Sequence, residues 1–105
     1  MEPLSEPVLL ILLSLADRPR HGYAILQHTR EISGGRVRLS TGTLYGALRR
    51  LLQDRWIERF REQDNSRGKQ TYRLTALGRR NLQTEANRLQ HLTRVAKLRA
   101  APKEA

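Results

Sequence analysis

The sequence lacks cysteine and the residue patterns from which metal and catalytic sites are commonly built. It contains no cysteine, which excludes disulfides, thiolate chemistry and cysteine-based zinc sites. The histidines His21, His28 and His91 form no His/carboxylate pair at a recognised ligand spacing, so we expect no metal site and no cofactor. There is no phosphate-binding glycine loop, nucleophile elbow or carboxylate pair of the kinds that enzymes use. The sequence therefore predicts a protein that is not an enzyme.

Long apolar runs are also missing. The longest one, residues 8–13, is far shorter than the roughly 20 residues that a transmembrane helix needs. Glu2 and Glu6 flank it, nothing basic precedes it, and no small-residue cleavage site follows, so it does not resemble a secretory signal. We expect a cytoplasmic protein without membrane contact.

Acidic and aromatic residues are scarce, and basic residues are abundant. The 105 residues contain 20 Lys+Arg against 10 Asp+Glu, a formal net charge of +10, and the positive excess begins at Arg36. Such an excess favours a polyanionic partner, because each neutralised phosphate releases counterions. The few aromatic residues are too scattered for a platform that stacks single-stranded bases, so double-stranded DNA is the favoured partner.

Local patterns predict a mostly α-helical chain with a small β-hairpin. The nearly all-apolar segment 8–16, behind the cap Ser5, predicts a helix buried on every side. The remaining elements are expected as a helix over 20–33, a short strand over 36–39, a helix from Ser40 to about 54, strands over 56–60 and 70–74, and a helix over 76–100. This order is that of a winged helix-turn-helix, in which the third helix enters the major groove and the hairpin loop lies on the flanking DNA. We expect a DNA-binding domain over residues 1–75, a C-terminal dimerisation helix over 76–100 and a disordered tail over 101–105.

The side of the third helix opposite its leucines carries the main candidate DNA contacts. Two glycines there, four residues apart, each cost about 1 kcal/mol of helix stability against alanine, and close approach of another backbone would explain them. Hydroxyls at the helix start can donate to phosphates or base edges. The alternative is an ordinary solvated face. The candidates are Ser40, Thr41, Gly42, Thr43, Tyr45, Gly46, Arg49 and Arg50.

Two further regions are candidates for DNA contact. Arg67, Gly68 and Lys69 form a basic hairpin tip suited to phosphate or minor-groove contact, although their charge has the alternative role of keeping the loop soluble. Tyr23, on the polar side of the second helix, is equally suited to touching phosphate or packing on a partner chain.

The last predicted helix is longer than a small domain needs, which favours a homodimer. Its apolar residues repeat at coiled-coil spacing, and the first helix offers a second apolar surface. The candidate dimer contacts are Leu9, Leu12, Leu13, Leu82, Ala86, Leu89, Leu92 and Ala96.

Four motifs in order make residues 8–85 resemble the PadR family of bacterial transcriptional regulators, in its short form. Behind the apolar first helix they are PRHGYAI (19–25), LSTGTLYGALRRL (39–51), WIE (56–58) and YRLTALG (72–78). The resemblance implies a dimeric winged-helix repressor, with Ser40, Thr43 and Tyr45 on the DNA-reading helix and Gly68 and Lys69 at the wing tip. The family usually has proline at the positions of Thr41 and Gly46, so the start of this helix and its base contacts are expected to differ in detail.

The resemblance also raises the question of an effector. Some family members bind flat aromatic drugs or phenolic acids at the dimer interface, where an aromatic residue of the C-terminal helix often takes part. Residues 76–105 contain no Trp, Tyr or Phe, so we expect an effector other than a stacked aromatic, meeting Leu89 and Leu92, or none at all.

Three functions are thus compared. The sequence favours a sequence-specific dimeric repressor on a roughly palindromic operator. A non-specific architectural DNA-binding protein is the first alternative, because the charge alone would support it. A winged helix that uses its last helix to bind another protein is the second, and the glycine-bearing polar face of the third helix argues against it.

Overall fold

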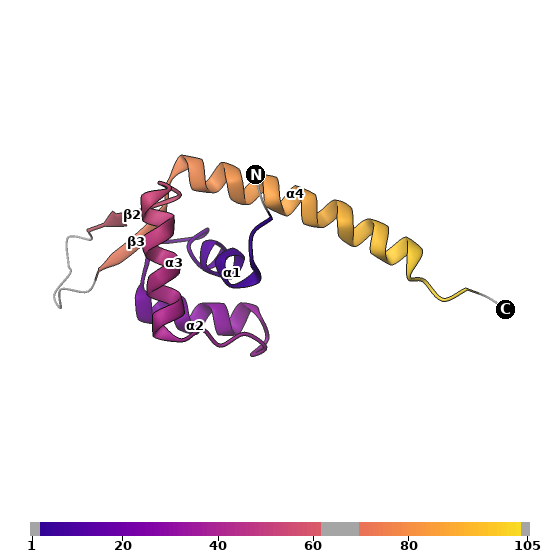
Figure 1. Ribbon diagram of the computed structural model, residues 1–105, viewed down its shortest axis with the longest axis horizontal. Coiled ribbons are helices and arrows are strands. Elements are labelled where there is room, and N and C mark those ends of the chain that lie inside the picture. Colours follow the sequence, from indigo (N-terminus) through magenta and orange to yellow (C-terminus); the bar gives the residue numbers. More distant parts are fainter. Residues whose placement is uncertain (1–2, 62–69, 104–105) are drawn as a thin grey trace.

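A computed structural model describes residues 3–61 and 70–103. Helices α1, α2 and α3 pack into a body, a small sheet lies at one end, and α4 runs along the body and extends past it (Figure 1). The elements are α1 (Glu6–Ser14), β1 (Arg20–His21), α2 (Gly22–Ile32), α3 (Thr41–Gln53), β2 (Ile57–Phe60), β3 (Thr71–Leu74) and α4 (Ala76–Arg99). This confirms the predicted mostly helical winged-helix architecture. Within these ranges no helix is long and apolar enough to cross a membrane.

Each helix begins at a side chain that accepts a hydrogen bond from its first turn. Ser5, Ser40 and Thr75 use their hydroxyls for α1, α3 and α4, and His21 uses Nδ1 for α2. Such caps stabilise a helix by about 1 kcal/mol each, because they pair a backbone N–H that has no partner inside the helix. Ser5 lies where the sequence predicts a cap, and α3 and α4 begin at the predicted places, directly after Ser40 and Thr75.

The core is mostly aliphatic, with Tyr72 as a buried aromatic residue, and lies between the three short helices, the sheet and the first part of α4. Ile11, Ile25, Leu44 and Ile57 are almost completely buried in it. The prediction that the first helix is buried on every side is wrong for the single chain: Leu13 is 36% exposed, because the body covers only part of α1.

The sheet has three antiparallel strands in the order β1-β3-β2. The predicted hairpin is confirmed, with Ile57 opposite Leu74 and Phe60 opposite Thr71. The second helix begins at Gly22 rather than at Arg20, because Arg20 and His21 pair with β3 instead.

The predicted short strand over residues 36–39 is wrong. The described chain has no strand there, and the segment is instead held by the end of α2, where the Val37 N–H donates to the Ser33 hydroxyl (3.0 Å). The alternation that suggested a strand comes from Leu39, which packs against the core, and from the half-buried Val37.

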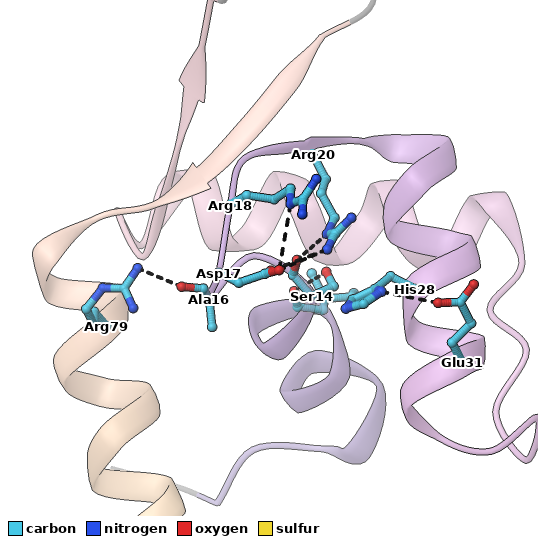
Figure 2. A network of polar contacts seen from close by, with 9 residues as sticks. Ser14, Ala16, Asp17, Arg18, Arg20, His28, Glu31 and Arg79 are labelled. Carbon is cyan, nitrogen blue, oxygen red and sulfur yellow. Dashed lines mark hydrogen bonds and ion pairs between the residues drawn. The ribbon is translucent and has the colours of Figure 1, made fainter.

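The turn after α1 is held by a network of polar contacts (Figure 2). The Arg20 guanidinium donates to the Ser14 carbonyl (2.7 Å) and pairs with the Asp17 carboxylate (3.2 Å). Arg79, at the start of α4, donates to the Ala16 carbonyl (3.1 Å). The end of α1 is thereby joined to both β1 and α4.

The start of α4 is seated on the backbone at Trp56. The Thr75 N–H donates to the Trp56 carbonyl (3.0 Å), and Gly78 approaches so closely that an added Cβ would overlap that carbonyl oxygen and lie 2.8 Å from its carbon. The predicted long helix is confirmed, and its second half projects beyond the body (Figure 1).

A buried carboxylate fixes the N-terminal segment to α4. Glu85 is 2% exposed and accepts hydrogen bonds from the Leu4 N–H (2.8 Å) and from the Arg88 guanidinium. The bond from Arg88, with the Leu4 amide adding to it, holds the pKa of Glu85 below its ordinary value. The ionised form of Glu85 is therefore the one that the fold favours.

Glu85→Gln should flatten the loss of stability in acid. Because its pKa is lower in the folded chain, ionised Glu85 stabilises the fold above its unfolded pKa, and that contribution is lost as the pH falls through the folded pKa. Urea unfolding between about pH 3 and 7 should therefore give the variant lower stability at neutral pH and a shallower acid slope. Glu58→Gln, which removes an exposed ion pair with Arg73, is the control expected to change little. Equal acid slopes for parent and Glu85→Gln would contradict this assignment.

Candidate nucleic-acid interface

The outer face of α3 is exposed along its whole length. Its leucines Leu44, Leu48 and Leu51 are buried in the core, which turns the opposite side outward. A Cβ added at Gly46 would meet no atom within 4 Å, and at Gly42 only the Ser40 hydroxyl at 4.0 Å. The candidates on this helix are all exposed: Ser40, Thr41, Gly42, Thr43, Tyr45, Gly46, Arg49 and Arg50.

Hydroxyl groups cluster at the start of α3. The Ser40 hydroxyl accepts a hydrogen bond from the Thr43 N–H (3.1 Å) and donates to the Thr43 hydroxyl (2.9 Å). The helix N-terminus attracts anions through amides that have no intrahelical acceptor. This end of α3 is therefore suited to a phosphate, with Thr41 beside it in the exposed first turn.

The two candidate tyrosines lie together although they come from different helices. His21, Gly22, Tyr23, Tyr45 and Gln70 line a notch of about 180 Å³ between the start of α2, α3 and the base of the wing. Tyr23 is 62% exposed and Tyr45 47% exposed, so both rings border the notch and reach solvent. Tyr23 of α2 therefore borders the same notch as Tyr45 of α3.

Tyr23 makes one aromatic contact and one hydrogen bond at the edge of the notch. Tyr23 stacks on His21 with 6.5 Å between ring centroids, and it accepts a hydrogen bond from the Gln27 amide (3.3 Å). Behind the notch, burial raises the pKa of Tyr72, and the nearby Tyr45 hydroxyl adds to the effect. Tyr72 therefore stays neutral and serves the core.

The two arginines of α3 face different surroundings. Arg49 lies on the exposed outer face, whereas Arg50 borders a groove of about 500 Å³ on the flank of the helix. Leu4, Val8 and Trp56 are among the other residues of this groove. Arg50 therefore lines a different hollow from the one that the two tyrosines border.

The base of the wing holds an arginine whose charge is paired. Arg73 pairs with Glu58 (2.7 Å) and lies over the Phe60 ring, 4.5 Å from its centroid. The predicted tip residues Arg67, Gly68 and Lys69 lie outside the described residues.

Arg36 and Arg38, in the segment that leads into α3, are exposed cations outside the set of predicted DNA contacts. The onset of positive charge at Arg36 was the available signal for them.

The candidate dimer contacts divide into two groups. Leu12 is completely buried and Leu82 is 8% exposed, so their assignment to a dimer interface is corrected: both belong to the core of the single chain. The other six keep at least part of their surface uncovered. They are Leu9, Leu13, Ala86, Leu89, Leu92 and Ala96.

Comparison with protein families gives a match to the model described as the transcriptional regulator PadR-like family, over residues 11–84. The chain belongs to this family. The matched region contains α2, α3, the sheet and the first part of α4, which together hold the notch and the exposed α3 face.

Solved structures of PadR regulators share the fold. A PadR family regulator from Clostridium difficile superposes with a TM-score of 0.79 at 24% identity, over 92% of this chain and all of that one. A PadR-like regulator from Bacillus cereus gives 0.77 at 18% identity, over 91% and 92% of the two chains. Bacillus subtilis PadR, solved in complex with operator DNA, gives 0.63 at 24% identity, over 73% of this chain and 44% of that one.

A relative in sequence is a 37.1 kDa protein of transposon TN4556 from Streptomyces fradiae. It is 39% identical over 85 residues, which is 81% of this chain. The present chain spans 23% of that protein's length, so the similarity covers only a part of it.

Proposed function

We propose that this PadR-family protein is a dimeric repressor that binds double-stranded operator DNA in the cytoplasm. The observation that carries the proposal is the outer face of α3. This face is exposed along the helix, begins with hydroxyl side chains and contains two glycines at which an added methyl group would point into open space. A helix presented in this way fits the major groove. The Bacillus subtilis relative bound to operator DNA supports the same use of the fold.

Some of the candidate residues would position the protein on the DNA backbone, and others would contact bases. Ser40, Thr43 and Tyr45 would set the register and read some bases, while the hydroxyl or amide of Thr41 would bind phosphate. Gly42 and Gly46 would admit the DNA backbone, and Tyr23 would contact phosphate beside the notch. Most of the salt-sensitive affinity would come from Arg49, Arg50, Arg67 and Lys69, and Gly68 would be a further DNA-binding residue.

The second half of α4 would join two copies. Gly78 and Leu82 lie on the side of α4 that is buried against the body. Further along the same side the helix leaves the body, and its apolar residues there are partly or fully exposed: Leu89, Leu92 and Ala96. A second chain would bury this stripe together with Leu9 and Leu13, and Ala86 would lie at its edge. Residues 1–75 would then read DNA, residues 76–100 would form the dimer, and 101–105 would be a tail. The two α3 helices would meet half-sites about one helical turn apart.

Effector binding at this dimer interface would differ from aromatic stacking. The exposed apolar residues of α4 are aliphatic, as with Leu92 (47% exposed) and Leu98 (75% exposed). A flat ligand would find no Trp, Tyr or Phe ring on this helix. We therefore propose that any effector is not a stacked aromatic, and micromolar binding of a planar dye by the dimer would contradict this.

The proposed function predicts selective DNA binding. The purified protein should bind a duplex from its own upstream region about 10³-fold or more tightly than a scrambled duplex of equal length, at physiological salt. Titration of both duplexes across salt measures this preference. Equal affinities with equally steep salt slopes would favour an architectural DNA-binding protein, whereas binding to neither duplex would favour a protein-interaction module.

A further inference from the structure

Gly22, the first residue of α2, lies directly against the ring of Tyr45 on α3. A Cβ added at Gly22 would lie 2.5 Å from the Tyr45 hydroxyl oxygen and 3.0 Å from Cζ. Gly22 is itself buried, whereas Tyr45 is 47% exposed. The hydroxyl end of the Tyr45 ring thus packs on the backbone of Gly22, and we call this contact the seat of Tyr45.

Backbone geometry does not explain a glycine at this position. Among the described glycines only Gly34 and Gly35 have φ in the left-handed region, so the backbone of Gly22 is one that other residues adopt. Alanine is also the better helix former. What distinguishes Gly22 from Gly42 and Gly46 is its neighbour, because the latter two face open space.

The seat lies next to the second exposed tyrosine. His21 caps α2 by accepting the Ala24 N–H at Nδ1 (3.3 Å), and Tyr23 stacks on the His21 ring. The turn that supplies the seat for Tyr45 therefore also orients Tyr23. Both rings border the same notch, although one belongs to α2 and the other to α3.

We propose that Gly22 is a positioning residue for DNA reading. By lacking a side chain, it holds the Tyr45 ring against the start of α2, so that Tyr23 and Tyr45 meet the same stretch of duplex as one unit. A ring seated before binding loses less rotational freedom when the DNA arrives, which favours the complex. The inference rests on the proposed function, because the role it assigns is a role in operator binding.

A double-mutant cycle tests the coupling between the two residues. Parent, Gly22→Ala, Tyr45→Ala and the double variant are titrated against the upstream duplex and its scrambled control. Gly22→Ala should weaken specific binding about tenfold in the parent, and by less than about twofold in the Tyr45→Ala background. Tyr45→Ala should weaken specific binding at least as much while leaving the dimer intact. Gln90→Ala, an exposed substitution on α4, is the matched control and should bind like the parent.

A measurement without DNA separates the seat from the function. In NMR spectra of the free protein, Gly22→Ala should shift the ring resonances of Tyr45, because the new methyl group displaces the ring. Unshifted resonances, or an equal loss of binding in both backgrounds, would overturn the positioning role while leaving operator binding standing. A ring shift in a protein whose parent prefers no duplex would overturn the proposed function, and the role in DNA reading with it.

Discussion

Gly78→Ala is expected to lower the free energy of unfolding by about 3 kcal/mol or more. The added methyl group would overlap the carbonyl oxygen of Trp56, and this oxygen already accepts the Thr75 N–H. Neither partner is a flexible side chain, so α4 or the start of β2 must move. For a domain of this size, the melting temperature should fall by at least about 12 °C.

Thermal and urea unfolding of parent and variant measure the effect. Gly46→Ala is the matched control, because it makes the same chemical change in a helix where nothing stands within 4 Å of the new methyl group. If Gly78→Ala melts within a few degrees of the parent, the close seat of α4 on Trp56 does not exist in solution.

Gly46→Ala is expected to have opposite effects on stability and on DNA binding. The substitution should raise the free energy of unfolding by about 0.5–1 kcal/mol, because alanine suits a helix interior better than glycine. If the DNA backbone approaches α3 at this point, the methyl group should cost about 1–3 kcal/mol of binding, which is roughly 5-fold to 150-fold in affinity. A variant that is more stable and yet binds more weakly would identify the surface that meets DNA.

Unfolding by urea and titration with the upstream duplex measure the two effects on the same preparation. Gln90→Ala on α4 provides a helix-stabilising change far from the proposed DNA surface and should leave binding unchanged. Unaltered operator affinity in Gly46→Ala would show that this face of α3 is not pressed against the duplex.

The helices were the predictable part of the fold because their signals are local. Ser40 and Thr75 each accept a hydrogen bond from the backbone N–H three residues further along the chain, which is the usual cap spacing. The leucines of α3 recur at helical spacing. The strand at Arg20 was missed because two residues carry no alternation, and β1 exists only through its pairing with β3. The reverse error, at residues 36–39, arose because alternating burial also occurs in a segment that merely lies on the core.

The candidate site was predictable in composition but not in its contacts. Solvent-facing residues of α3 follow from the position of its leucines, and all of them are exposed as expected. The seat of Tyr45 on Gly22 joins residues on two helices, and no periodicity within either helix reveals it. Glu85 was overlooked for the same reason: its burial depends on Leu4, at the other end of the chain.

The projecting half of α4 converts a small change of angle at its base into a larger displacement at its end. Beyond Glu85 it continues for residues 86–99, roughly 20 Å at the helical rise per residue. A tilt of about 5° at the base would move the tip by about 2 Å, more than half the roughly 3.4 Å step between base pairs. In the proposed dimer, small changes at Gly78 or Glu85 would therefore alter the separation of the two α3 helices. Preference among operators of different half-site spacing would be tuned at residues that never touch DNA.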